Sequence, residues 1–186
     1  MRAVIKRWSG LGFLIRLAIV SLAGVAWAVS SLHLVLGHPN YWDPVTAADF
    51  FAVYAFSAAW LLTAASLVIL REAACPARPL SAAILVVAAG CTLAGIANGV
   101  EDGFGVAGFG LLYVIGAIVG GFGLFAVAAM LWASPARDLA FVPGIGGITM
   151  VLVTTGGGVL ALAGWLGFGV ILIRERRSPE AVPSAA

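Results

Sequence analysis

The chain has 186 residues, of which 62% are hydrophobic and 10% charged, and its formal net charge is +2. Soluble domains carry about 25% charged residues, so this chain lacks the charge that a water-facing surface requires. The composition excludes a soluble globular protein, a nucleic-acid-binding protein and a disordered chain. It indicates an integral membrane protein whose surroundings are the lipid bilayer, and we expect an all-α, polytopic transmembrane helical bundle.

Five apolar stretches are long enough to cross a bilayer. Each is close to or above the ~20 residues with which a helix crosses a hydrocarbon core. None shows the period-two alternation of a barrel strand, so helices are favoured. We therefore predict one transmembrane domain over residues 1–177 and a disordered tail over 178–186. The predicted spans are 17–36, 51–70, 80–98, 106–133 and 148–173.

The start of the second span carries two overlapping capping signals. Asp43 followed by Pro44 is typical of an N-cap with proline at the first helical position. Thr46 and Asp49 have the spacing of a capping box. The first span raises a separate question, because Ala26-Trp27-Ala28 fits the small-x-small pattern of signal-peptide cleavage. Its apolar run continues to Leu36, so an uncleaved first span is favoured and cleavage stays the alternative.

Basic residues predict the orientation. They precede the first span, occupy the loop 71–78 and follow the fourth span, whereas the loops 37–45 and 99–105 contain no Lys or Arg. Short loops rich in Lys and Arg stay in the cytoplasm, so we expect a cytoplasmic N-terminus.

The tail is an exception to this rule, because a fifth span would carry Arg174, Arg176 and Arg177 to the outside. A re-entrant hairpin over 139–173, turning near Gly156–Gly158, would keep them inside. Its arms would be about 22 Å long, too short to cross, and its broken backbone would need protein cover. A single fifth span is therefore favoured, and the hairpin stays the alternative.

The candidate ligand-binding site lies on the predicted outer side. All eight carboxylates fall outside the spans or at their margins, which argues against an ion pump. Asn98, Glu101 and Asp102 share one face if the third helix continues to residue 102, because residues three and four apart are neighbours. His33 lies near the end of the first span, toward the same surface. Imidazole and carboxylate groups suit a cation, so a divalent metal ion is a possible ligand of these four residues.

Two other interpretations of these residues stay open. Glu101 or Asp102 could act as an acid or base, because each disfavours the charged form of the other. Alternatively, Glu101 and Asp102 are solvated turn residues, Asp43 and Asp49 cap a helix, and His33 bonds a neighbouring helix. No spacing matches a known metal or catalytic signature, so we predict no catalytic residue and no cofactor other than the possible divalent cation.

Small residues predict how the helices pack. Gly116 and Gly120 in the fourth span fit the small-xxx-small pattern that lets helix backbones approach, as do Gly90 with Ala94 and Gly95 with Gly99 in the third. We expect them to join the third and fourth spans. A homodimer or another membrane protein bound through the same faces is the alternative.

Aromatic residues form a stripe on the second span: Phe50, Phe51, Tyr54 and Trp60. This stripe either lines a pocket for a lipid or another apolar ligand, or packs against lipid and neighbouring helices. A stripe that faces lipid or packs against neighbouring helices is the favoured interpretation.

Three functions follow from these patterns. The first is a non-enzymatic accessory, scaffold or sensor subunit that acts through helix contacts and an acidic outer face. The second is a carrier or binding protein for a small apolar or cationic solute, and the third is an intramembrane enzyme that uses Glu101 or Asp102 on a lipid. Arginine outnumbers lysine nine to one, which is typical of GC-rich bacteria, so we expect a multi-pass protein of a bacterial cell membrane.

Overall fold

The computed structural model describes residues 5, 7–36, 43–152 and 157–177, and these contain helices and no strand. Five helices are long and apolar enough to cross a membrane: α2, α3, α4 with η1, α5 and α7. The chain is therefore a multi-pass membrane protein with an all-α bundle fold, as its composition predicts. The elements in chain order are α2 (Gly10–Val35), α3 (Ala47–Ala74), α4 (Arg78–Asn98), the π-helical turn η1 (Gly99–Gly103), α5 (Gly110–Trp132), the short turn η2 (Arg137–Leu139), α6 (Phe141–Leu152) and α7 (Gly158–Arg177).

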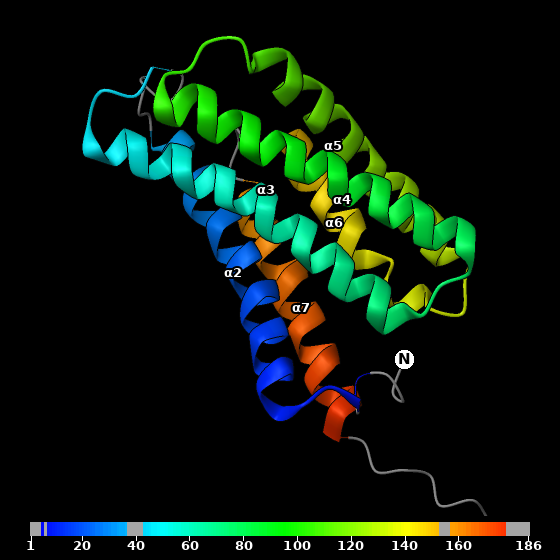
Figure 1. Ribbon diagram of the computed structural model, residues 1–186. Helices are drawn as coiled ribbons and strands as arrows, with labels where there is room; N and C mark the ends of the chain where they lie inside the picture. Colours follow the sequence, from blue (N-terminus) through cyan, green and yellow to red (C-terminus); the bar gives the residue numbers. More distant parts are fainter. Residues whose placement is uncertain (1–4, 6, 37–42, 153–156, 178–186) are drawn as a thin grey trace, which may run out of the picture.

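The helices α2 to α7 close a ring. Each packs against the helix that follows it in the chain, and α7 returns to pack against α2. Figure 1 shows α3, α4 and α5 side by side, with α2 and α7 running together at an angle to them. Trp27 of α2 meets Phe56 and Trp60 of α3 edge to face, with ring centroids 5.4 Å apart in both pairs. These buried rings give α2 and α3 a common aromatic core.

The predicted start of the second span is partly wrong. Asp43 does not cap the helix, because α3 begins at Ala47 with Thr46 as its N-cap. The Thr46 hydroxyl accepts a hydrogen bond from the Asp49 amide (3.2 Å), and the Asp49 carboxylate accepts one from the Thr46 amide (2.9 Å). The Thr46–Asp49 capping box is favoured because it satisfies two amides that have no helical partner.

A single fifth helix over 148–173 does not form. Instead α6 and α7 run antiparallel, and the chain reverses after Leu152. Gly164 of α7 packs against Ile145 of α6, as expected for two arms of one hairpin. The alternative hairpin over 139–173 is therefore the arrangement found.

Side chains of α2 and α6 form hydrogen bonds with the backbone at the tip of the hairpin. The Gly158 amide donates to the Ser31 hydroxyl of α2 (3.1 Å), and the Thr149 hydroxyl donates to the Gly157 carbonyl (3.2 Å). Gly158 lies so close to Trp27 that a Cβ atom there would meet the α2 backbone. Broken backbone is tolerated at membrane depth where protein groups satisfy it. The sequence argument against the hairpin failed for two reasons. α7 has 20 residues and extends to Arg177, so this arm is long enough to cross, and α2 covers the tip.

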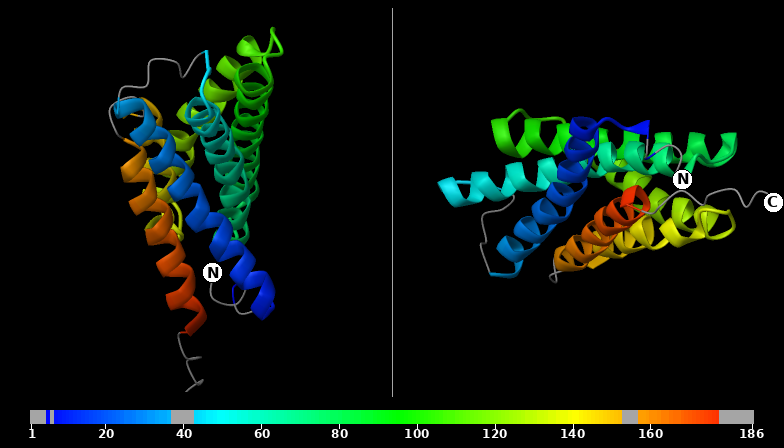
Figure 2. Two further views of the ribbon diagram at one scale, coloured as in Figure 1. Left: turned by 90° about the vertical axis from the view of Figure 1, so that its left-hand side faces the viewer. Right: turned by 90° about the horizontal axis from the view of Figure 1, so that it is seen from below.

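The hairpin brings both described ends of the chain to one end of the bundle, as the two views in Figure 2 also show. Its tip contacts Ser31, which lies 15 residues after Arg16, or roughly 22 Å along α2. From there α7 returns, and its Arg176 side chain donates to the Trp8 carbonyl near the start of α2 (3.5 Å).

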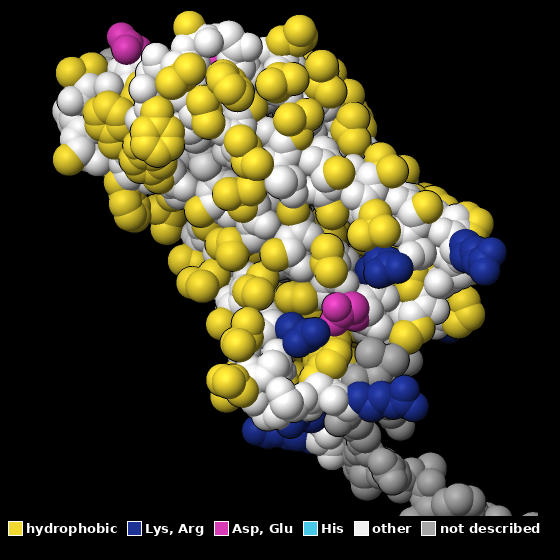
Figure 3. Space-filling view, viewed as in Figure 1, with side chains coloured by type: hydrophobic (Ala, Val, Ile, Leu, Met, Phe, Trp, Pro, Cys, Tyr) yellow, Lys and Arg dark blue, Asp and Glu magenta, His cyan; other side chains and the backbone are white. Residues whose placement is uncertain are grey.

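The described arginines lie at one end of the bundle. Arg16 pairs with Glu72 (3.0 Å) and Arg71 donates to Ser81 (2.6 Å), which joins α2, α3 and α4 at one end. Lys and Arg side chains gather toward this end in Figure 3. We call it the basic end, and it holds the described residues Arg7, Arg16, Arg71, Arg78, Arg137, Arg174, Arg176 and Arg177. The opposite, acidic end holds Asp43, Asp49, Glu101 and Asp102.

Helices α4 and α5 touch backbone to backbone, as the small-residue spacing predicts. A Cβ atom on Gly116 would lie 2.5 Å from the Ala94 amide nitrogen, and one on Gly90 would lie 2.8 Å from the Gly120 nitrogen. No side chain fits such gaps, so glycine at these positions lets the two helices approach.

The other small pair of α4 faces a different helix from the one predicted. A Cβ atom on Gly95 would lie 2.9 Å from the Ser57 carbonyl oxygen, and one on Gly99 would lie 3.3 Å from the Ser57 hydroxyl. Gly95 and Gly99 therefore pack against α3, so α4 uses small residues toward both of its neighbours. A homodimer or partner protein at small-residue faces stays a prediction.

Cysteine labelling separates the hairpin from a single fifth span. The background is Cys75→Ser with Cys91→Ala, which removes both free thiols. Because the two ends of the chain lie together, Ala77→Cys and Arg177→Cys should react with an impermeant maleimide from one side of the membrane, and Ala107→Cys from the other. If Arg177→Cys reacts from the same side as Ala107→Cys, the hairpin is wrong.

Leucine at position 116 should force α4 and α5 apart. Overpacking of this kind costs about 1–3 kcal/mol, so Gly116→Leu should lower the thermal midpoint in detergent. Gly10→Leu is the control, because nothing lies within 4 Å of a Cβ atom there. Equal midpoints for the two variants would contradict the backbone contact.

Candidate functional site

The acidic end contains a cavity of about 380 Å³ between α4, η1 and α5, which we call the acidic pocket. Asn98, Glu101 and Asp102 line it from α4 and η1, and Gly110 and Tyr113 line it from α5. The structure thus brings together three of the four predicted site residues, because the helix continues past α4 as the π-helical turn η1.

Packing between α4 and α5 determines which residues meet in the acidic pocket. The helices are antiparallel and held together at their glycines, so Tyr113 near the start of α5 falls beside Asn98 at the end of α4. Nearer the loop, a Cβ atom on Gly110 would lie 3.0 Å from Glu101 Oε2. Glycine at position 110 therefore leaves the space that the Glu101 carboxylate occupies.

Asn98 is the buried polar group of the acidic pocket, with 2% of its surface exposed. Its Nδ2 atom donates to Ser57 Oγ at 2.9 Å and to the Val53 carbonyl at 3.5 Å, both on α3. A carbonyl oxygen can only accept, so these contacts turn the amide nitrogen toward α3. The Oδ1 atom has no hydrogen-bond partner among the described residues. A buried acceptor left in this state costs about 1–3 kcal/mol, so a donor group would be stabilised beside it.

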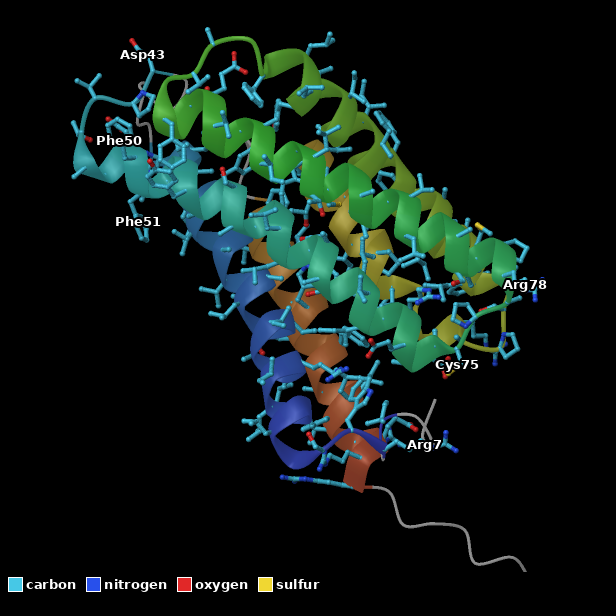
Figure 4. The ribbon with its side chains drawn as sticks, in the orientation of Figure 1. Arg7, Asp43, Phe50, Phe51, Cys75 and Arg78 are labelled. Carbon is cyan, nitrogen blue, oxygen red and sulfur yellow. The ribbon has the colours of Figure 1, made fainter. Side chains whose placement is uncertain are left out.

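A third carboxylate lies nearby. Asp43, labelled at this end in Figure 4, lines a neighbouring cavity of about 480 Å³ together with Glu101 and Asp102. The sequence contains no Lys or Arg in segments 17–70 and 79–136, which include every residue lining the two cavities. Carboxylates without basic neighbours create a negative potential that attracts cations.

His33 does not join the other predicted site residues. Its Nε2 atom lies 3.7 Å from Asp49 Oδ1, so it connects α2 to the start of α3. The other carboxylate oxygen of Asp49 accepts hydrogen bonds from Val45 and Thr46. His38, the other histidine of the chain, lies outside the described residues. The interpretation of His33 and Asp49 as structural groups matches these contacts.

Within the described residues, no three His, Cys, Asp or Glu side chains lie close enough together to hold a metal ion. Metal ions need ligand atoms that converge at about 2.0–2.6 Å. The predicted divalent-cation site with an imidazole ligand therefore has no geometry to support it.

The aromatic stripe of the second span divides between several environments. Phe51 and Tyr54 are exposed, Phe50 lines the cavity beside Asp43, and Trp60 is buried in the bundle. The Tyr54 hydroxyl donates to the Gly103 carbonyl (2.9 Å) and so holds η1 against α3. Trp60 alone of the four lines an apolar cavity between α3, α5 and α6.

Sequence reasoning missed Tyr113 and Ser57. Tyr113 is the one hydroxyl-bearing residue of α5, and its ring lies 6.3 Å from that of Phe56. A lone polar side chain in an otherwise apolar span was the available signal. Its place in the same pocket as Asn98 depends on the register between two helices, which the sequence does not reveal.

We found no family model, curated protein or solved structure that matches this chain. A fold class by itself does not define a function. The role of the acidic pocket therefore has to be argued from its own geometry.

Ser57→Ala should destabilise the protein through the bond to Asn98. Hydrogen bonds between membrane helices contribute about 0.6 kcal/mol on average and up to about 1.7. Ser30→Ala is the matched control, because Ser30 is also buried but donates within its own helix, to the Ala26 carbonyl (2.7 Å). Chemical denaturation in detergent measures both, and an equal loss of stability would contradict an interhelical role for Ser57.

Proposed function

We propose that this chain is a membrane-embedded binding protein for a small organic cation, which it holds in the acidic pocket. The observation that carries the proposal is Asn98, whose buried Oδ1 atom lacks a partner among the described residues and which lines a cavity together with Glu101 and Asp102. An ammonium group carries a positive charge and several N–H donors, so it suits an amide oxygen beside two carboxylates.

The size of the acidic pocket favours an organic cation over a metal ion. Its volume of about 380 Å³ falls within the range of small-molecule sites, about 300–1,000 Å³. Two carboxylates line this space, whereas a metal ion needs several converging ligands, and no three candidate ligands come together among the described residues. A substituted ammonium ion can occupy the space and contact the carboxylates from inside it.

The proposed orientation places the acidic pocket outside the cell and the basic end in the cytoplasm. The positive-inside rule supports it, since the basic end collects arginines from the first helix, two loops and the end of α7. The hairpin removes the one exception to that rule. The composition supports a bacterial cell membrane as the location.

Solute binding has stronger support than the two other hypotheses. A scaffold or accessory subunit needs no cavity beside a buried acceptor. An enzyme that uses Glu101 as an acid or base would gain from His33 within hydrogen-bond reach, but His33 lies against Asp49 instead.

Thermal melting of the protein in lipid nanodiscs tests the proposal, with butylammonium as the probe. A ligand that binds only the folded state stabilises it by about 2.7 kcal/mol at a hundredfold excess over Kd. Butylammonium should therefore raise the melting temperature, whereas butanol and butyrate, which are similar in size but neutral and anionic, should not. Sodium chloride keeps the ionic strength equal in every sample.

Charge variants identify the site. Glu101→Gln combined with Asp102→Asn keeps the shape of the pocket and should abolish the shift. Asp138→Asn is the control, because this carboxylate is exposed at the basic end and should leave the shift unchanged. A shift that survives in the double variant, or an equal shift with butanol, would overturn the proposal and favour a scaffold role.

A further inference from the structure

A second cavity, of about 320 Å³, opens on the side of the bundle between α3, α5 and α6. We call it the apolar pocket, and its walls include Phe56 and Trp60 of α3, Phe122 and Phe125 of α5, and Met150 of α6. Phe122 is 68% exposed and Trp60 is 2% exposed. The cavity therefore leads from the surface of the bundle to its buried core.

The short α6 helix leaves this cavity open. It has 12 residues, whereas α5 has 23. Gly147 of α6 packs against Phe125, and Met150 packs near Gly121, after which α6 ends at Leu152. α6 thus covers only the half of α5 that lies nearer the basic end. The apolar pocket occupies the place where a full-length helix would cover the other half.

Trp60, which lines the apolar pocket, carries an unsatisfied hydrogen-bond donor. Its Nε1 atom is buried and has no partner among the described residues. The adjacent Trp27 shows the usual arrangement, because its Nε1 atom donates to Thr63 Oγ1 at 2.9 Å. Buried indole N–H groups normally find an acceptor. The donor of Trp60 therefore points to a bound molecule that supplies one.

The apolar pocket adjoins the acidic pocket, since Tyr113 and Val114 line both. From there the apolar pocket continues along α5 to Gly121, which lies eight residues after Tyr113, or about 12 Å along the helix. A molecule that passed along Tyr113 and Val114 would have a polar group beside Asn98 and a chain directed toward Trp60.

We propose that the ligand is an amphiphilic organic cation, whose ammonium head lies in the acidic pocket and whose apolar chain lies in the apolar pocket. A hydrogen-bond acceptor within the chain, such as an ester carbonyl, meets the Trp60 donor. This inference rests on the proposed function, because it assigns a chain to the cation bound there. The carboxylates of Asp43, Glu101 and Asp102 disfavour a head that also carries a phosphate, so the ligand is an amine and not a phospholipid.

Hydrophobic transfer contributes little to this binding. Lipid tails are as apolar as the side chains of the pocket, so a chain gains little by leaving the bilayer. The chain instead concentrates the cation in the membrane beside the lateral opening, and its acceptor satisfies Trp60. A substitution in the apolar pocket does not change how the ligand partitions into lipid. Comparing such variants with the unchanged protein therefore isolates the contribution of the pocket.

The test measures the binding of two tritiated amines of similar length to the protein in zwitterionic nanodiscs. Dodecylammonium has a plain chain, and the hexyl ester of aminohexanoic acid has a carbonyl within its chain. Partition into protein-free nanodiscs is subtracted. Ala117 lines the apolar pocket and Ala126 is exposed elsewhere on α5, so phenylalanine at these positions gives matched variants. Ala117→Phe should weaken both amines about tenfold, the equivalent of roughly 1.4 kcal/mol, and Ala126→Phe should weaken neither.

Trp60→Phe keeps the aromatic wall and removes the donor. It should weaken binding of the ester by about threefold to tenfold, the range expected for one hydrogen bond, and leave dodecylammonium unchanged. Ethanolamine phospholipid added to the nanodisc should displace neither amine, and displacement would show that a lipid head is the ligand.

Butylammonium is too short to reach Trp60 and reports on the acidic pocket alone. The Ala117→Phe variant should bind butylammonium normally, which would show that it is folded. If it does not bind butylammonium, the binding of the ester to Trp60→Phe tests the inference instead. Unchanged binding of both long amines to the pocket variants would overturn this inference while the proposed function stands. If butylammonium binding does not depend on Glu101 and Asp102, the proposed function is wrong and this inference with it.

Discussion

The backbone contact between α4 and α5 is the interaction on which the two cavities depend. Gly90, Gly116 and Gly120 remove the side chains that would hold these helices apart. The resulting register puts Tyr113 of α5 in the same cavity as Asn98 of α4. Apolar helices gain little from the hydrophobic effect once they are in lipid, so close packing of this kind provides much of their attraction.

Polar contacts from α3 then hold the rest of the bundle on this pair. Thr63 accepts from Trp27 of α2, Ser57 accepts from Asn98 of α4, and Tyr54 donates to the backbone of η1. Each bond satisfies the two polar groups that it joins away from water, as a lipid environment requires. Three buried atoms on or beside this helix, Asn98 Oδ1, Trp60 Nε1 and Ser66 Oγ, have no partner among the described residues, and the first two belong to residues that line cavities.

The hairpin of α6 and α7 connects the topology to the proposed function. Because α7 returns to the end where α2 begins, the arginines of both chain ends lie together and leave the opposite end acidic. Because α6 stops at Leu152, one side of α5 is left open as the apolar pocket. The same chain reversal thus separates the charges and opens the lateral cavity. A continuous fifth helix would have done neither.

The sequence by itself determined the features that depend on composition or on neighbouring residues. The length of the apolar stretches predicted the membrane-spanning helices, because few other structures can cross a bilayer with all their backbone hydrogen bonds formed. The spacing of nearby residues predicted the Thr46–Asp49 capping box. It also predicted that Asn98, Glu101 and Asp102 share one helix face, and these three residues line one pocket in the structure. These features need only the geometry of a single helix.

Tertiary structure decided whatever depends on residues far apart in the chain. The break in the predicted fifth span is stabilised by Ser31, which lies 127 residues before the Gly158 amide that it accepts from. The partner of His33 proved to be Asp49, and Tyr113 entered the acidic pocket through the register of α4 and α5. Spacing within one helix carries no information on which face of another helix it will meet. The faces that meet are determined by the packing of side chains from both helices, so they are seen only in the folded bundle.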